Sequence, residues 1–582
     1  MPVRPTPRVD VVLLLALGLA FVLRAWGLAY GLPHVYNPDE VAILSRALSL
    51  ADRGLNPGNF VYPSLYFYLL AALTGAVYIG QWLTGAAASL DAFQRAFWTD
   101  PSSIYLAARA LSVAAGVATV AMTYVLARAV AGRTAAGAAA LLLAVAYVPV
   151  RDAHMIKHDV IATLLFTLVV WQSRRVWQRG RLVDYALAGG LAGVTLAFHY
   201  YGIVAVVPVA AAAILRAGGL PALARDRGVL VAAGAWALAF AALSPYVLLD
   251  AGTAARDIAQ NRQIIVDRAR ETFGLLGAGR EQARLMIVQG AGAPMVIAAL
   301  AGAVMLGRRS WREAVWLFAL PAAFALLLTQ TWPYGRLQNA LYPFVAIAAA
   351  IGIQGVTSLV SSISGTAMAT SRTFPARLTR QFLLVVCAAI PLWHSVLMNR
   401  LMTREDTRTE ARRWIEANVP DGAGVAVQPY SVPLETSRDW QLATLGQAGP
   451  REPMGSRARG LLARAPYPAP AYRLVILGSG GLDRDKRFLA SDAILAAPGV
   501  SELRRAGVAY VVLKRMSADE PDPLRDRIAP DGALLYRAWP FDDPAATAPA
   551  QLPDHDLRPS RTTRQPGPIV EVWRIAPGGH ER

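Results

Sequence analysis

Apolar runs of about twenty residues, separated by short polar stretches, dominate the first 400 positions of the chain. A helix of that length crosses the hydrocarbon core of a bilayer. From residue 401 onward, charge, proline and glycine increase and the apolar runs shorten to the length of strands. The pattern predicts a polytopic α-helical membrane module over residues 1–400 and a soluble α/β domain over residues 401–582.

Arginine clusters between the apolar runs indicate how the chain is oriented, because basic loops remain on the cytoplasmic side. Residues 1–10 and 128–134 both carry such clusters, so an even number of spans must separate them. Three apolar stretches compete, and the middle one, 64–88, is interrupted by three glycines and a glutamine. We therefore expect residues 31–103 to form one large outer loop with interfacial helices.

The remaining apolar runs bring the prediction to about eleven spans. They cover residues 11–30, 104–130, 135–150, 160–174, 184–199, 202–217, 229–249, 292–307, 314–330, 341–360 and 381–399. An odd number of spans places the N-terminus in the cytoplasm and the C-terminal domain outside the plasma (inner) membrane. Within that domain the pattern predicts a helix and three strands, at Arg408–Asn418, Tyr472–Leu477, Val508–Leu513 and Ile569–Ile575.

Composition agrees with a membrane protein. Hydrophobic residues make up 55% of the chain, charged residues only 16%, and the mean hydropathy is +0.37, whereas soluble proteins carry about 25% charged residues. The net charge of +18 comes almost entirely from arginines that flank apolar runs. Membrane orientation explains them better than a nucleic-acid partner. The single cysteine, Cys387, excludes intrachain disulfides and cysteine metal sites.

A short acidic motif follows the first apolar run. Asn37 is the expected N-cap of an amphipathic helix that begins at Pro38, with Asp39 and Glu40 in its first turn. One interpretation is that the two acids only complement the helix N-terminus. The other is that a carboxylate there orients an acceptor hydroxyl and accepts its proton. His34 precedes the same motif.

Two further polar segments fall at predicted outer ends of spans. The first is His154-Met155-Ile156-Lys157-His158-Asp159, whose lysine and histidine suit a phosphate; the alternatives are an interfacial loop with snorkelling cations or a metal site with HxxxH spacing. The second is Thr331–Arg336, where an arginine among aromatics either holds a lipid phosphate or belongs to an aromatic belt. His199-Tyr200-Tyr201 is a further belt candidate.

Several motifs, in this order, resemble those of a known superfamily. They are Asp39-Glu40, Tyr62-Pro63-Ser64-Leu65-Tyr66, Arg109-Ala110-Leu111-Ser112, Asp159, Ser244-Pro245-Tyr246, Arg336 with Tyr342-Pro343, and Arg412–Pro420. Over residues 10–430 the chain resembles the protein O-mannosyltransferases and lipid A aminoarabinose transferases of the glycosyltransferase C (GT-C) superfamily. It departs from the usual pattern in having a single proline at position 63 and a histidine at position 199, where many members have lysine.

The resemblance implies a GT-C fold and a hexosyl- or pentosyltransferase. Such an enzyme moves a sugar from a polyprenyl-phosphate donor to an acceptor hydroxyl on the outer face, with inversion. It implies Asp39 as base, with Glu40 and Asp159 also in the catalytic set. The donor phosphate would contact Lys157, His158, His199 and Arg336, and the acceptor or lipid would contact His34, Tyr62, Tyr200 and Tyr334.

No cofactor or metal is predicted, although a divalent metal remains compatible with the pattern. The expected partners are the lipid-linked sugar, a glycan, lipid or protein acceptor, and membrane lipid, with no nucleic acid. Two other classes stay open. A lipid or solute transporter would place its polar cluster near the midplane and repeat its two halves. A non-catalytic envelope assembly protein would use only its outer domain for binding.

Overall fold

The computed structural model of the chain describes residues 10–223, 225–364, 373–447, 460, 462–477, 500–546 and 561–575. The chain divides into two compact units. The membrane unit comprises Met1–Leu28, Asp39–Gly75 and Ala107–Val396, and the C-terminal unit comprises Ala29–Pro38, Ala76–Leu106 and Leu397–Arg582. Two segments of the predicted first outer loop thus belong to the C-terminal unit.

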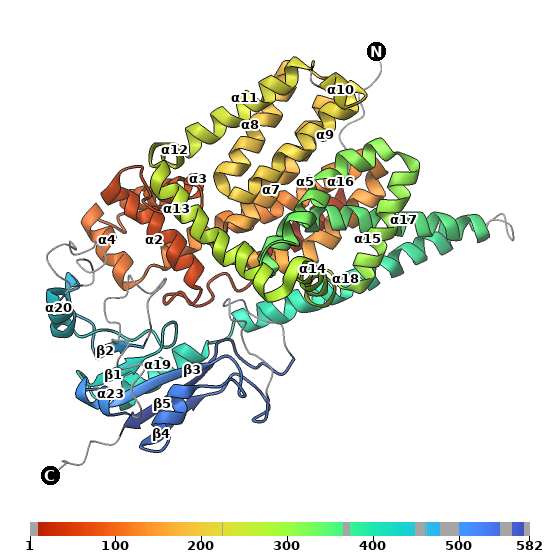
Figure 1. Cartoon of the computed structure of the whole chain (residues 1–582). Coiled ribbons are helices and arrows are strands. Elements are labelled where there is room, and N and C mark those ends of the chain that lie inside the picture. The colour runs from red at the N-terminus through yellow and green to blue at the C-terminus, as the bar shows by residue number, and fades with distance from the viewer. Residues whose placement is uncertain are drawn as a thin grey trace, which may run out of the picture. The chain divides into compact units, whose positions relative to one another are not determined.

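Long apolar helices build the membrane unit (Figure 1). In chain order the helices up to residue 249 are α1 (Val11–Ala25), α2 (Pro38–Arg53), α3 (Leu65–Leu83), α5 (Ser102–Val145), α6 (Tyr147–Asp152), α7 (His158–Gln178), α8 (Leu182–Phe198), η1 (Tyr200–Ala205), α9 (Val206–Ala217), α10 (Leu220–Leu223), α11 (Arg227–Leu243) and α12 (Tyr246–Leu249). The later ones are α13 (Ala251–Arg262), η2 (Gln263–Asp267), α14 (Arg268–Leu285), η3 (Met286–Gly290), α15 (Ala293–Arg309), α16 (Trp311–Leu328), η4 (Gly335–Leu341), α17 (Tyr342–Ser364) and α18 (Thr373–Met402).

Each predicted span coincides with helical structure, which confirms a polytopic helical protein, while the number eleven remains a prediction. The predicted span 104–130 falls within α5, and the span 135–150 covers the end of α5 and the start of α6. Gly132 has φ 79° and interrupts the helical backbone between the two spans. By length and composition alone, α3 is also able to span. The expectation that residues 31–103 form one outer loop therefore stays a prediction.

Glycines allow pairs of helices in the membrane unit to pack closely. A Cβ atom at Gly189 or Gly193 of α8 would collide with the backbone of α11, and one at Gly302 of α15 or Gly352 of α17 would collide with the facing helix. Close backbone approach at small residues is the usual packing mode of membrane helices, because lipid supplies no hydrophobic drive for their association.

A five-stranded sheet forms the core of the C-terminal unit. The strands β1 (Gly424–Val427), β2 (Arg473–Ile476), β3 (Tyr510–Arg515), β4 (Gly532–Ala538) and β5 (Ile569–Ile575) lie in the order β2-β1-β3-β5-β4. The pairs of β1 with β2 and β3 are parallel, and those of β5 with β3 and β4 antiparallel. The three predicted strands are found here within two residues at each end.

Helices cover both faces of this sheet. On one face, Ala411 and Ile415 of α19 (Thr407–Asn418) pack against Val425, Val512 and Val570. On the other face, α23 (Ser501–Arg505) and α24 (Pro523–Ile528) pack against alternate strand positions. The unit also contains α4 (Leu90–Thr99) and α20 (Arg438–Gln447). The alternation of buried side chains gives a two-sided α/β arrangement.

Candidate functional site

An ion pair between Asp39 and Arg336 marks the candidate site in the membrane unit. Asp39 lies in the first turn of α2 and Arg336 in η4, 297 residues later. The Arg336 Nη1 donates to Asp39 Oδ2 over 2.6 Å, and the Asp39 side chain is 34% exposed while that of Arg336 is 14% exposed. The Arg336 guanidinium also lies 4.5 Å from the centre of the Tyr334 ring. A carboxylate that solvent reaches is thus held at a fixed cation.

Several predicted site residues lie within electrostatic range of this pair. Arg336 interacts with Asp159, His158 and His199, and the Tyr62 hydroxyl interacts with Arg336, Asp39 and Asp159. The structure therefore brings together side chains from five separate segments of the sequence.

Arg46 is a member of this cluster that the sequence analysis did not identify. Its charge acts on both Tyr62 and His158. It follows Asp39 by seven residues on α2, which is close to two full turns and places both on one helix face. That spacing was the available signal, but the residue was assigned to the polar side of an interfacial helix.

Aromatic rings enclose His158. The Tyr62 ring stacks on it at 4.2 Å between centroids, the Tyr66 ring lies at 4.4 Å and the His199 ring at 5.9 Å. His158 is 2% exposed, and within the described part of the chain its Nε2 has no hydrogen-bond partner. A buried imidazole nitrogen without a partner is costly unless a ligand satisfies it.

The segment after α8 supports the cluster from another side. The Tyr201 hydroxyl donates to Asp159 Oδ1 over 3.0 Å, and the Tyr201 ring stacks on His199 at 3.7 Å. The Tyr200 hydroxyl donates to the backbone oxygen of Phe60 over 2.9 Å, two residues before Tyr62. Lys157 is 2% exposed and its charge acts on Asp159. The segment thus positions both the acid and the aromatic loop.

Glu40 has a different environment from Asp39. Its carboxylate receives two hydrogen bonds from Arg109, at 2.8 and 2.7 Å, and one from the backbone N–H of Ile156 at 2.9 Å. Arg109 also donates to the backbone oxygen of Leu28 over 2.7 Å, and both charged side chains are almost fully buried. This pair ties α2 and α5 to the segment before α7. The geometry favours a structural role for Glu40 over the predicted catalytic one.

Two predicted histidine positions lie outside the cluster. His154 has both ring nitrogens engaged with backbone oxygens, those of Val150 at 2.8 Å and Trp26 at 3.0 Å. His34 belongs to the C-terminal unit, where its ring lies 3.1 Å from Arg412 Nη1; burial and the Arg412 charge lower its pKa to about 4. Among the described residues, no three His, Cys, Asp or Glu side chains are grouped so as to hold a metal ion.

Residues 251–290, which lie outside every predicted span, hold two of the site segments in place. Asp257 accepts from the Phe60 N–H over 2.7 Å, and Asn261 donates to the Val61 oxygen over 3.3 Å. The backbone N–H of Trp332 donates to Ile265 O over 2.6 Å, and the Arg268 guanidinium lies 3.9 Å from the Trp332 ring centre. The Tyr62 loop and the segment before Arg336 therefore share one support.

One known protein family matches part of the chain. The family model for dolichyl-phosphate-mannose-protein mannosyltransferase matches residues 102–248. No curated protein matches the chain. The matched segment is about a quarter of the chain, and its family is one that the motifs also resemble.

Among solved structures, the chain is similar to ArnT from Cupriavidus metallidurans bound to undecaprenyl phosphate. The two share 13% identity over 96% of this chain and 97% of that one, with a TM-score of 0.50. The oligosaccharyltransferase of Archaeoglobus fulgidus is also matched, with 12% identity over 86% and 69% of the two chains and a TM-score of 0.42. At these identities the likeness to ArnT concerns the fold.

Proposed function

We propose that this protein transfers a sugar from a polyprenyl-phosphate donor to an acceptor hydroxyl on the outer face of the membrane, with inversion. The observation that carries the proposal is the partly exposed Asp39 carboxylate, paired with Arg336 inside a cluster of cations and aromatic rings. The ArnT structure similar to this chain binds undecaprenyl phosphate, a lipid of the proposed class.

Asp39 acts as the general base in the proposed reaction. The acceptor oxygen attacks the anomeric carbon, its proton passes to Asp39, and the bond between that carbon and the phosphate oxygen breaks. The lipid phosphate leaves with the electron pair. Because the attack comes from the face opposite the phosphate, a single displacement inverts the anomeric centre. Asp39 lies in the first turn of α2 and is paired with Arg336, which holds it in place for this step.

Positive charge from three segments receives the leaving phosphate, whose charge grows as the bond breaks. Arg336 has five N–H donors and directs one of them to Asp39 Oδ2 over 2.6 Å, and its planar fork suits a phosphate as well as a carboxylate. Arg46 and Lys157 add charge, and His158 offers its unpartnered Nε2. Asp159, bonded to Tyr201, orients Lys157.

The aromatic residues have supporting roles in this proposal. Tyr62 holds the His158 ring and lines the space beside Asp39, and Tyr334 supports the Arg336 guanidinium. Tyr200 fixes the loop that carries Tyr62. His199 packs against Tyr201. No step passes through a metal or a nucleotide, because the lipid phosphate already activates the sugar.

The proposed location is the plasma (inner) membrane, with the N-terminus cytoplasmic and the C-terminal α/β domain outside. The donor sugar is a hexose or pentose, and the acceptor is a glycan, lipid or protein.

Donor consumption by purified protein tests the proposal. The protein in lipid nanodiscs is incubated with synthetic undecaprenyl-phosphate hexoses and pentoses, and release of undecaprenyl phosphate is measured by mass spectrometry. We expect Asp39→Asn to lower turnover by about 10²–10⁴-fold, the usual contribution of a general base. Asp91→Asn is the matched control, because Asp91 is also an acid in the first turn of a helix but is exposed. Wild-type turnover by folded Asp39→Asn protein would overturn the assignment.

A further inference from the structure

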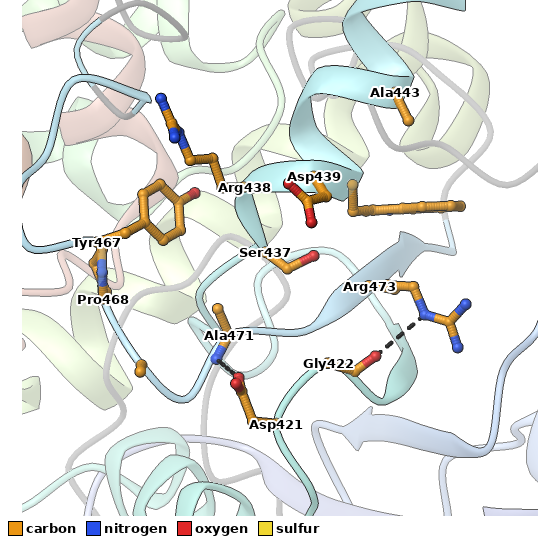
Figure 2. A pocket seen from close by; sticks show the side chains of 12 residues that line it. Asp421, Gly422, Ser437, Arg438, Asp439, Ala443, Tyr467, Pro468, Ala471 and Arg473 are labelled. Atoms are coloured by element: carbon orange, nitrogen blue, oxygen red, sulfur yellow. Dashed lines mark hydrogen bonds between the residues drawn. The ribbon is translucent and has the colours of Figure 1, made fainter.

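A cavity in the C-terminal unit lies apart from every residue assigned above. Its volume is about 660 Å³ and it opens between the start of α20, the segment 467–471 that precedes β2, and the turn at 421–422 that precedes β1 (Figure 2). The volume falls within the range of about 300–1,000 Å³ that small-molecule sites occupy.

Two aromatic residues in the cavity wall are held rigidly. The Trp440 Nε1 donates to the backbone oxygen of Leu474 over 2.8 Å. The Tyr467 hydroxyl donates to the Thr436 backbone oxygen over 2.7 Å and lies 3.1 Å from Gln441 Oε1. Because the polar atom of each side chain is already hydrogen-bonded within the protein, Trp440 and Tyr467 contribute apolar ring surface to the cavity wall.

Charged side chains in the same wall retain unused hydrogen-bonding capacity. Within the described part of the chain, neither Arg438 nor Asp439 has a hydrogen-bond or ion-pair partner. Asp421 uses one carboxylate oxygen to accept from Ala471 N–H over 2.7 Å, and Arg473 uses its Nε to donate to Gly422 O over 3.1 Å. Figure 2 shows Ser437 and Asp439 in the cavity wall, where α20 begins.

The charges in the wall balance, two acids against two arginines. A site for a phosphate, a nucleotide or an acidic polymer would carry excess positive charge. A balanced set of donors and acceptors beside rigid aromatic rings instead suits a neutral ligand with many hydroxyls and an apolar C–H face. Adjacent hydroxyls of a sugar both donate and accept, so carboxylate and guanidinium groups are each satisfied by them.

We propose that this cavity binds a neutral oligosaccharide, with Trp440 and Tyr467 against its ring faces and Asp439 and Arg438 on its hydroxyls. Its assignment as part of the acceptor rests on the proposed function, while binding itself does not. The C-terminal unit then selects the acceptor and Asp39 carries out the chemistry.

A glycan array tests the proposal with the full-length protein. The protein is fluorescently labelled in nanodiscs and applied to immobilised di- and trisaccharides of mannose, glucose, galactose and N-acetylglucosamine. We expect wild-type binding to at least one of these. Asp439→Asn and Trp440→Ala should each weaken it tenfold or more. Asp526→Asn is the matched control, since this acid lies on α24 in the same unit, outside the cavity wall.

The outcomes separate this inference from the proposed function. Absence of wild-type binding, or unchanged binding by Asp439→Asn, would overturn the cavity assignment even if donor turnover is observed. Binding to the array without donor turnover would retain the cavity and refute the glycosyltransferase. Trp440 also packs against the core of the sheet, so Asp439→Asn decides the matter if Trp440→Ala unfolds. Asp39→Asn should bind the array as the wild type does.

Discussion

The Asp39–Arg336 pair makes a prediction of opposite sign for its two partners. In the structure, the Arg336 guanidinium donates to the Asp39 carboxylate over 2.6 Å. If Arg336 grips the donor phosphate, that phosphate competes with Asp39 for the same cation. Removing Asp39 should then strengthen donor binding, and removing Arg336 should weaken it.

The magnitudes follow from exposure and bond type. With Asp39 one-third exposed, the pair contributes no more than about 1 kcal/mol, so Asp39→Asn should raise donor affinity by roughly two- to fivefold. A hydrogen bond to a charged phosphate contributes about 1.5–3 kcal/mol, so Arg336→Ala should weaken affinity by roughly ten- to hundredfold. Lys157→Ala should lose a similar amount. Arg336→Lys should recover only part of the loss, because an ammonium cannot form a bidentate fork.

The assay is a titration of a non-hydrolysable undecaprenyl-phosphonate sugar into purified variants in nanodiscs. Arg280→Ala is the matched control, because Arg280 is an exposed arginine of α14 in the same unit. If the Asp39–Arg336 pair serves only to fix η4 against α2, donor binding should be weakened or unchanged in both Asp39→Asn and Arg336→Ala. Unchanged affinity in Arg336→Ala and Lys157→Ala would remove both from the donor site and restore the aromatic-belt interpretation.

Three further predictions concern stability, topology and pH. Glu40→Gln should lower the free energy of unfolding by about 3–5 kcal/mol, because the buried Arg109 charge loses its ion-pair partner, and turnover per folded molecule should stay the same. Loss of activity at full thermal stability would indicate that Glu40, and not Asp39, is the general base. Asp91→Cys and Leu55→Cys, both exposed, should react with a membrane-impermeant maleimide from outside, whereas labelling of Asp91→Cys only from the cytoplasm would mean that α3 crosses. Lowering the pH from 6.5 to 4 should destabilise the C-terminal unit, because burial and Arg412 lower the pKa of His34 to about 4 and the unfolded chain therefore binds the proton first. In His34→Gln the melting temperature should lose this part of its pH dependence. A melting profile unaltered by the substitution would contradict the prediction.

The local sequence pattern was sufficient to predict the helices and strands but not which residues form ion pairs within the site. The apolar runs predict the helices, and proline after asparagine predicts that α2 begins at Pro38. In contrast, Asp39 and Glu40 are adjacent, and a helix turns them about 100° apart. The sequence alone does not say which of them faces the buried arginine. That outcome depends on Arg109 and Arg336, which lie 69 and 297 residues away from their partners.

Long-range support was equally beyond the sequence. Asp257 and Asn261 read as ordinary polar positions of a helix, and only the folded chain shows that they hold the backbone of Phe60 and Val61. Arg46 was missed for a related reason. Its helix was interpreted as interfacial, with Arg46 away from the apolar stripe, whereas the charge of Arg46 acts on Tyr62 and His158 within the protein.

The residues just before Asp39 are completed by a part of the chain made much later. Tyr30 donates to Asp406 over 2.8 Å across 376 residues, Tyr36 bonds Thr409, and Arg408 lies 3.9 Å from the Tyr36 ring. At about 5–20 residues per second of synthesis, the ribosome reaches residue 406 roughly 20–75 seconds after residue 30. Until then the segment that leads into Asp39 lacks its packing partners. A nascent chain therefore makes the helices up to α17 first, and the segment before Asp39 gains these partners only after residue 409 has been made.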